Sequence, residues 1–166
     1  MNKYKGITLL SALLVLLFLG TSCNKTNGAN DVSDFPDIGL PIKNVNSQLK
    51  IRQPKEFSIS KDQCAFVIVE NITDSVITIE PEVDVKIFQK TGSEWKIIPN
   101  NLNYNGSKSS VPVKGGDLPN IRTVDMCPGL YKLSEPITLR IIITGTPKNI
   151  DGVQKAISFT DITVTP

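Results

Sequence analysis

The sequence of 166 residues contains no histidine. Histidine is a frequent general base and metal ligand, and it is a member of the Ser-His-Asp and Cys-His catalytic sets, so sites that need it are excluded. The sequence also has no glycine-rich phosphate loop and no nucleophile–base pair. Aromatic residues make up only 6% of the chain, with a single tryptophan. We therefore expect a protein that is not an enzyme and that uses no metal or other cofactor.

The first 22 residues have the pattern of an export signal. Two basic residues, Lys3 and Lys5, precede an uncharged stretch whose apolar core runs from Ile7 to Leu19. That core has 13 residues, whereas a helix needs about 20 apolar residues to span a membrane. The pattern predicts a cleaved signal peptide over residues 1–22 rather than a permanent spanning helix.

The end of this signal carries a cysteine after three small residues, in the order Gly20, Thr21, Ser22, Cys23. The segment resembles the lipobox of bacterial lipoproteins, although Gly20 stands where that family usually has an aliphatic residue. The resemblance implies cleavage before Cys23 and attachment of diacylglycerol and further acyl chains, such as palmitate, to it. Each buried CH₂ contributes about 0.8 kcal/mol, so two or three chains hold a protein on a membrane. The expected location is the bacterial cell envelope, outside the cytoplasm, with the lipid anchored in a membrane, which is the outer membrane if the cell is Gram-negative.

The chain left after cleavage has no net charge. The signal contains two of the 18 basic residues and no acidic residue, so 16 of each sign remain. Nucleic-acid binding depends on clustered positive charge, so we exclude nucleic acid as a partner. We expect contact with the membrane through the lipid anchor, not through charge.

Residues 24–47 are rich in Asn, Asp, Ser, Gly and Pro and show no sustained hydrophobic period. Together with Cys23 they predict a lipidated, flexible tether over residues 23–47. Asp31, Asp34 and Asp37 recur there at every third position. A calcium loop needs further ligands and a glycine, so we interpret these carboxylates as solvated linker residues.

Residues 48–166 have the pattern of short strands separated by turns. Pro112 indicates an edge strand, because proline cannot donate to a strand ladder, and residues 91–93 predict a hairpin turn. No stretch of ten residues has helical periodicity, so we predict one all-β domain, a β-sandwich. The expected strands cover residues 64–69, 76–79, 83–87, 94–98, 111–113, 121–124, 139–144 and 156–164.

The last expected strand has an irregular pattern of apolar residues. Ile157 and Phe159 share one face of a regular strand, whereas Ile162 and Val164 share the other. If only one face of the strand is buried, a bulge is needed to bring both pairs to that side. We therefore predict a bulge or a switch between sheets near residues 160–161.

Two further cysteines, Cys64 and Cys127, lie within the expected domain. In an exported protein these thiols meet an oxidising environment. A disulfide between them would close a loop of about 63 residues and contribute about 3–4 kcal/mol on the chain-entropy model. The alternative is two separate buried thiols, since cysteine often serves as a small apolar residue.

Three segments resemble a family of bacterial immunoglobulin-like domains found in lipoproteins. Residues 66–79 are similar to the strand, Asn-x-Thr-Asp turn and returning strand of that family, and residues 85–95 to its hairpin ending in tryptophan. Residues 127–133 resemble its Pro-Gly-x-Tyr entry to a late strand, where Tyr131 matches a tyrosine corner. The resemblance implies an immunoglobulin-like sandwich in the envelope and no particular reaction. The chain departs from antibody domains because Trp95 does not lie on the central strand.

The clearest binding candidates are Trp95 and Tyr104, which together could form a stacking platform for a sugar. Tyr104 belongs to a long polar loop, residues 100–110, and loops on a rigid sandwich often bind ligands. The alternative for Trp95 is a place in or near the core.

A second group consists of the alternating carboxylates Glu80, Glu82 and Asp84. On an extended chain these three share one face, where they could hold a cation or act as acid and base. Their alternation with valines is typical of the solvent face of a half-buried strand, which is the interpretation we adopt.

These patterns together predict a non-catalytic, membrane-anchored lipoprotein that displays an immunoglobulin-like interaction or structural domain in the cell envelope. Its expected partners are the membrane, through the lipid anchor, and an envelope protein. The alternative function is an envelope domain that binds a small ligand or a glycan.

Overall fold

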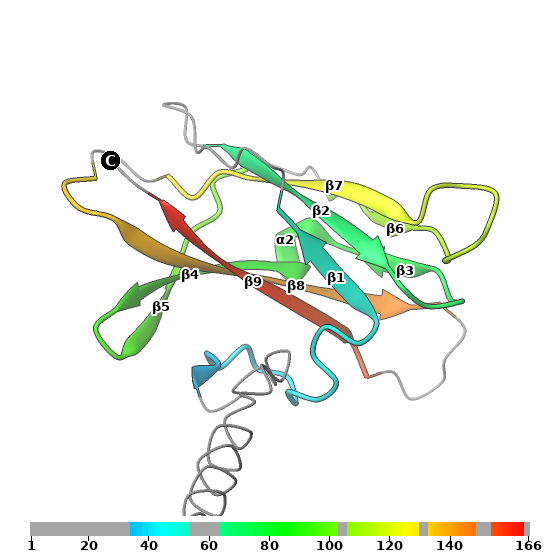
Figure 1. The fold of residues 1–166 in the computed structure, drawn as a ribbon, viewed down its shortest axis with the longest axis horizontal. Coiled ribbons are helices and arrows are strands. Elements are labelled where there is room, and N and C mark those ends of the chain that lie inside the picture. The colour runs from blue at the N-terminus through cyan, green and yellow to red at the C-terminus, as the bar shows by residue number, and fades with distance from the viewer. Residues whose placement is uncertain (1–33, 54–63, 103–105, 130–132, 149–153, 165–166) are drawn as a thin grey trace, which may run out of the picture. The chain divides into compact units, whose positions relative to one another are not determined.

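The computed structural model describes residues 34–53, 64–102, 106–129, 133–148 and 154–164 (Figure 1). Half of these residues lie in β-strands that form two antiparallel sheets, with almost no helix. This confirms the expected all-β architecture of two sheets. Cys23, Tyr104 and Tyr131 lie outside the described residues. Among the residues that the structure does describe, no helix has the length and hydropathy that crossing a membrane requires.

The smaller sheet has three strands in the order β1-β2-β7. Its strands are β1 (Leu49–Arg52), β2 (Ala65–Asn71) and β7 (Ile121–Met126). The central strand β2 buries Val67 and Val69 completely, because they alternate with residues on the outer face.

The larger sheet is built around β8 (Ile137–Pro147). Strand β9 (Ala156–Val164) pairs with β8 from Ile137 to Gly145, and β4 (Val85–Thr91) pairs with the middle of β8. Strand β3 (Ile77–Ile79) pairs with the last residues of β8 and with β6 (Ser109–Val111). Strand β5 (Glu94–Ile98) pairs with β4 across a turn at Gly92, whose φ is +62°, which confirms the expected hairpin.

A helical turn, α2 (Pro81–Asp84), interrupts the chain between β3 and β4. The sequence predicts an extended strand from residue 83, and this is wrong at its first two positions. Val83 lies on the turn with an exposed fraction of 58%, whereas Asp84 is only 2% exposed. Pro81 begins the turn because proline fits the first helical position, which needs no N–H donor. The strand pattern resumes at Val85.

The main hydrophobic core lies between the two sheets. Near the end of β8, Gly145 packs directly against the Ile77 side chain. A Cβ at this position would lie only 2.5 Å from the Ile77 Cγ2 atom, so a larger residue would not fit. The smaller sheet contributes the buried core residues Leu49, Val67, Val69, Val124 and Met126. The larger sheet contributes Ile77, Ile79, Val85, Ile87, Val111, Leu139, Ile141, Ile143, Ala156, Ile162 and Val164.

A second apolar cluster covers the outer face of the larger sheet. Ile38, Phe88, Ile142 and Ile157 are all buried there, with exposed fractions of 4% or less. Ile38 belongs to residues 34–46, which we call the N-terminal strap and which run across that face below β8 and β9 in Figure 1. The tether predicted over residues 23–47 is therefore wrong for the strap, which is packed against the domain. Residues 23–33 lie outside the described part.

The strap also explains why the predicted bulge in β9 is wrong. The pairing of β9 with β8 keeps one unbroken register along the whole strand. Ile162 and Val164 point into the main core, whereas Ile157 and Phe159 point to the opposite face and pack in the second cluster. Both faces of β9 are covered, so a regular strand satisfies both apolar pairs.

Candidate functional site

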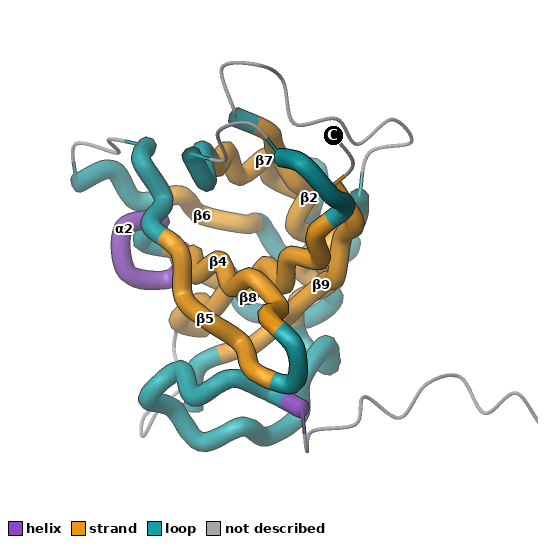
Figure 2. Tube along the Cα trace, turned by 90° about the vertical axis from the view of Figure 1, so that its left-hand side faces the viewer, coloured by secondary structure: helices purple, strands orange, loops and turns teal. Residues whose placement is uncertain are grey.

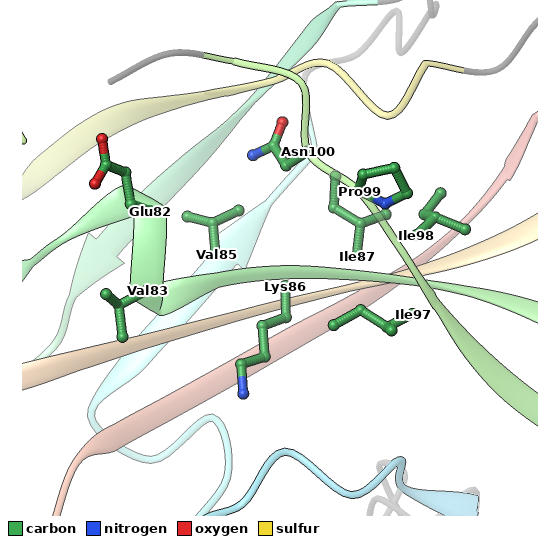
Figure 3. Close-up of a pocket in the computed structure, with 9 residues that line it drawn as sticks. All are labelled: Glu82, Val83, Val85, Lys86, Ile87, Ile97, Ile98, Pro99 and Asn100. Atoms are coloured by element: carbon green, nitrogen blue, oxygen red, sulfur yellow. The ribbon is translucent and has the colours of Figure 1, made fainter. Parts of the chain in front are cut away.

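The candidate site is an apolar groove beside α2, where the end of β5 turns away from β4 (Figure 3). It has a volume of about 470 Å³, within the range of binding cavities in proteins. Strand β5 pairs with β4 only as far as Ile98 opposite Ile87, so Val85 has no β5 residue beside it. The groove is lined by Glu82, Val83, Val85, Lys86, Ile87, Ile97, Ile98, Pro99 and Asn100.

The polar side chains of the groove are engaged with atoms elsewhere. The Lys86 Nζ donates a 2.7 Å hydrogen bond to the Ile38 carbonyl on the strap. A Glu82 Oε1 accepts a 3.1 Å bond from the Gly106 N–H, and the Asn100 Oδ1 accepts a 2.8 Å bond from the Cys127 N–H. The remaining lining is aliphatic. The groove therefore suits an apolar group and offers no acid–base pair for catalysis.

The apolar lining continues onto the surface. Val83 and Ile97 lie at the two sides of the groove, and their exposed fractions are 58% and 63%. Covering the exposed part of these two side chains under a partner would contribute about 1–2 kcal/mol each. The sequence gives little sign of this pair, because a strand pattern places Val83 inside the domain.

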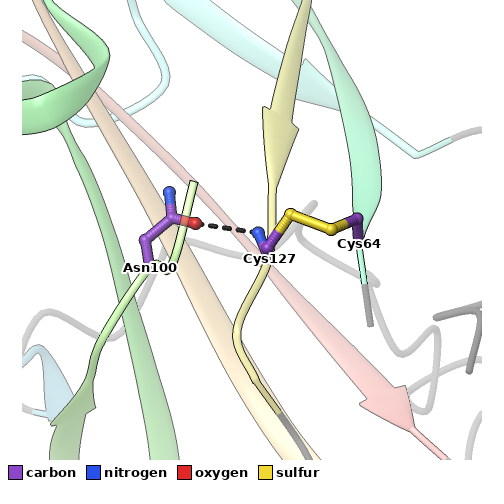
Figure 4. Close-up of a disulfide and its surroundings, with 3 residues drawn as sticks. All are labelled: Cys64, Asn100 and Cys127. Atoms are coloured by element: carbon purple, nitrogen blue, oxygen red, sulfur yellow. Dashed lines mark hydrogen bonds between the residues drawn. A yellow bond between two sulfur atoms is a disulfide. The ribbon is translucent and has the colours of Figure 1, made fainter. Parts of the chain in front are cut away.

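The groove is connected to the Cys64–Cys127 disulfide (Figure 4). The two cysteines follow the register of β2 and β7, in which Ala65 lies opposite Met126, and their Cα atoms are 4.0 Å apart. Besides the bond to Asn100, Cys127 accepts a 2.8 Å hydrogen bond at its carbonyl from the Asn101 N–H. The disulfide thus fixes the end of β7, which in turn holds Asn100 at the rim of the groove through these hydrogen bonds.

The bridge itself confirms the pairing that the sequence left open between a disulfide and two separate thiols. Cys64 directly precedes β2 and Cys127 directly follows β7, so the bridge joins two neighbouring strands of the smaller sheet.

The carboxylates Glu80, Glu82 and Asp84 do not share a face, because α2 turns the chain between them. Asp84 is buried, and its carboxylate accepts hydrogen bonds from the Thr144 hydroxyl, the Lys155 ammonium and the Glu80 N–H. Glu80 pairs with Lys108 at 2.6 Å. The interpretation of all three as a solvent face is wrong for Asp84, which ties α2 to β8.

Trp95 lies in the second cluster, not in the groove. The Arg140 guanidinium stacks on its ring with 4.2 Å between the Cζ atom and the ring centroid. The Trp95 Nε1 donates a 3.0 Å hydrogen bond to Asp34. The structure thus places Trp95 half-buried against the outer face of the sheet, whereas Tyr104 lies outside the described residues.

The strap is held by a polar network around Arg140, which is 7% exposed. Its guanidinium forms two hydrogen bonds of 2.7 and 2.8 Å with the Asp161 carboxylate, and its Nη1 donates to the Asp34 carbonyl at 2.6 Å. The Asp34 carboxylate pairs with Lys90 at 2.8 Å. The hydrogen bond from Lys90, followed by that from Trp95, lowers the pKa of Asp34 below its ordinary value.

The sequence did not identify Asp34 as a contact residue. Its spacing with Asp31 and Asp37 is also found in solvated linkers. Its side-chain partners, Lys90 and Trp95, lie 56 and 61 residues later in the chain, so no local pattern points to them. Within the described residues, no group of three cysteine or acidic side chains is placed to hold a metal ion. No protein-family model and no curated protein sequence matches this chain.

Proposed function

We propose that this protein is an exported bacterial lipoprotein that displays one immunoglobulin-like interaction domain in the cell envelope. The single structural observation that supports an interaction role is the apolar groove beside β5, whose polar side chains are engaged elsewhere. Such a lining offers contact area to a partner and no reacting group. The export signal and the lipid anchor on Cys23 rest on the sequence pattern of residues 1–23.

The strand order supports the immunoglobulin-like part of this proposal. In immunoglobulin domains the second strand lies between the first and the fifth, and the sixth lies between the third and the seventh. Here β2 lies between β1 and β7, and β8 lies between β4 and β9. The disulfide departs from the antibody pattern, because it joins neighbours within one sheet instead of bridging the two sheets.

The anchor is tested by the intact mass of the protein recovered from the envelope. The expected mass lacks residues 1–22 and includes the diacylglycerol and acyl chains on Cys23. A Cys23→Ser variant provides the control, since it should carry no lipid and should leave the membrane fraction. Retention of residues 1–22, or an unmodified Cys23, would contradict the proposal.

The interaction role is tested by chemical crosslinking in the cell. A C-terminally tagged full chain is crosslinked in the intact envelope, recovered, and its attached proteins are quantified by mass spectrometry. One envelope protein in near-stoichiometric amount is expected. A Val83→Glu variant, which places a charge at the side of the groove, should reduce that amount. Equal recovery with the variant would remove the groove from the interaction.

A small ligand or a glycan is the second candidate, and the volume of the groove favours it, since small-ligand cavities have volumes of about 300–1,000 Å³. Retention of the protein on immobilised cell-wall glycan fragments tests this alternative. Retention that is lost in Val83→Glu would support the groove as the glycan site. Retention that is lost in Trp95→Ala and kept in Val83→Glu would assign it to Trp95 instead.

A further inference from the structure

Strand β5 is the one described strand at a sheet edge with no strand of the facing sheet beside it. At one side of the domain β1 lies beside β9, and at the other side β6 lies beside β7. Strand β5 packs along β4 and makes extensive contact with no other described strand. The hairpin extends past the smaller sheet at the left of Figure 1, which is the side that faces the viewer in Figure 2. No other described strand therefore covers its outer side.

The pairing register shows which main-chain groups of β5 point to that outer side. In an antiparallel pair, opposite residues alternate between hydrogen-bonded and non-hydrogen-bonded positions. The two-residue turn makes Thr91 and Glu94 the hydrogen-bonded pair that closes the hairpin, so Lys96 opposite Gln89 is the next such pair. The N–H and C=O groups of Trp95 and Ile97 consequently point away from β4.

The opposite edge of the same sheet shows how such groups are satisfied elsewhere. On β9 the outward Phe159 N–H donates to the Asn46 Oδ1, and the outward Ile157 carbonyl accepts from the Asn46 N–H. The strap and β1 thus cover that edge. Outside the pairing of β5 with β4, no hydrogen bond between described residues uses the main chain of Trp95 or Ile97. Exposed main-chain groups on an edge strand are a template for pairing with another chain.

The groove adds a site for a side chain at the end of this template. It begins at Ile97 and continues along Ile98 and Pro99 to α2. A strand laid along β5 would pass over the groove as it leaves Ile97, so an apolar side chain near its end could enter. Main-chain pairing supplies affinity in such complexes, and pockets for individual side chains supply specificity.

A second copy of this chain could pair with β5 in three registers, and each has a defect. The register centred on Trp95 places Glu94 opposite Lys96, but it puts Ile97 opposite the turn residue Ser93, so only Trp95 is fully paired. In the register that pairs Trp95 of one copy with Ile97 of the other, the two Lys96 residues lie directly opposite each other. They form a non-hydrogen-bonded pair, which has the shorter Cα–Cα distance, so their charges repel. The register centred on Ile97 places Trp95 opposite Pro99, which has no N–H to donate. A partner strand with a carboxylate opposite Lys96 avoids these problems, because opposite charges attract across a strand pair.

We propose that the outer edge of β5 and the adjoining groove bind an extended segment of another protein by strand addition. The segment places an apolar side chain in the groove and an acidic side chain opposite Lys96. This inference rests on the interaction role proposed above and specifies its surface and its partner class.

The test uses two capped peptides, TVTVEVTV and TVTVKVTV, and residue-resolved amide hydrogen exchange of the folded protein. At about 1 mM peptide, where even weak pairing is populated, we expect exchange at Trp95 and Ile97 to slow by about twofold or more. Exchange at Lys96, already bonded to β4, should not change. The glutamate peptide should bind about threefold to tenfold more tightly than the lysine peptide.

Two variants decide the result. Lys96→Glu should reverse the preference between the peptides, whereas the matched Lys50→Glu, an exposed lysine on β1, should not. Ile97→Pro removes an outward N–H without removing a bond to β4, so it should abolish peptide binding and keep the hairpin. Unchanged exchange at Trp95 and Ile97 with both peptides, or an unchanged preference in Lys96→Glu, would overturn the inference.

The failure of this inference is distinguishable from failure of the interaction role. If the envelope crosslinking described above captures a stoichiometric partner equally well with wild type and Lys96→Glu, the interaction role stands and strand addition at β5 is wrong. If wild type captures no partner and neither peptide protects β5, both proposals fail. Loss of a captured partner in Lys96→Glu alone supports the inference.

Discussion

The Arg140 guanidinium donates a 2.6 Å hydrogen bond to the main-chain carbonyl of Asp34, 106 residues earlier in the chain. This bond joins the start of the strap to the centre of the larger sheet. The same guanidinium pairs with Asp161 and stacks on the rings of Trp95 and Phe159. A single buried cation therefore organises the outer face of the sheet.

We predict that Arg140→Met lowers the free energy of unfolding by about 2–3 kcal/mol, because it removes a buried guanidinium that is hydrogen-bonded to Asp161 and to the strap. Urea denaturation measures the loss. Arg52→Met is the matched control, since Arg52 pairs with Glu70 but its side chain is 63% exposed. It should cost less than about 1 kcal/mol. Equal losses in both variants would contradict the central role of Arg140.

We predict that acid weakens the attachment of the strap. Ionised Asp34 is stabilised by Lys90 and Trp95 in the folded protein, so its pKa lies below the unfolded value of 3.8. The stabilisation is present above that value and is lost as the pH falls through the lower, folded pKa. Fluorescence of the single tryptophan reports this, because the Trp95 Nε1 donates to Asp34. In Asp34→Asn the change in tryptophan fluorescence that follows protonation of Asp34 should disappear. The fluorescence change that accompanies unfolding of the whole domain in acid should remain.

We predict that reduction of the disulfide destabilises the domain by about 4 kcal/mol, as expected for a closed loop of about 63 residues on the chain-entropy model. Urea denaturation with and without dithiothreitol measures the difference. The double variant Cys64→Ser, Cys127→Ser should be equally destabilised and insensitive to dithiothreitol. Reduction should also accelerate amide exchange at Asn101, which donates to the Cys127 carbonyl. Unchanged exchange there would disconnect the disulfide from the groove.

We predict that Asn71→Ala costs about 3 kcal/mol in the free energy of unfolding, because the side chain is fully buried and its loss leaves several groups unsatisfied. Its Nδ2 donates to the carbonyls of Ser75, Val111 and Pro112, which links the two sheets. Asn120→Ala, which removes one bond to the Asn71 carbonyl, is the control and should cost about 1 kcal/mol. Thermal unfolding of both variants compares the two losses.

Local patterns were sufficient to locate most of the strands. Alternating or continuous apolar residues indicate a strand wherever one or both faces meet the core, and the strand expected over residues 156–164 matches β9. The hairpin turn at residues 91–93 was predictable because glycine at a positive φ is a local requirement. The candidate groove was not, since it needs the end of β5 and α2 to meet.

The errors share one physical cause, which is burial by residues distant in sequence. The strap has the composition of a linker because few of its residues are apolar, and its attachment depends on Arg140 and Asn46 contacts that no local pattern contains. Once the strap covers the sheet, the second face of β9 is buried without a bulge.

The sequence by itself determined the all-β class, the turns and the alternation that directs side chains to either face of a strand, because these depend on neighbouring residues. The signal peptide and the lipid anchor stay predictions from the pattern of residues 1–23. Only the tertiary structure decided which faces are covered, whether Cys64 and Cys127 meet, how Asp84 becomes buried and which sheet edge no described strand covers. These depend on contacts across tens of residues, whose free energies are set by packing and not by local preference.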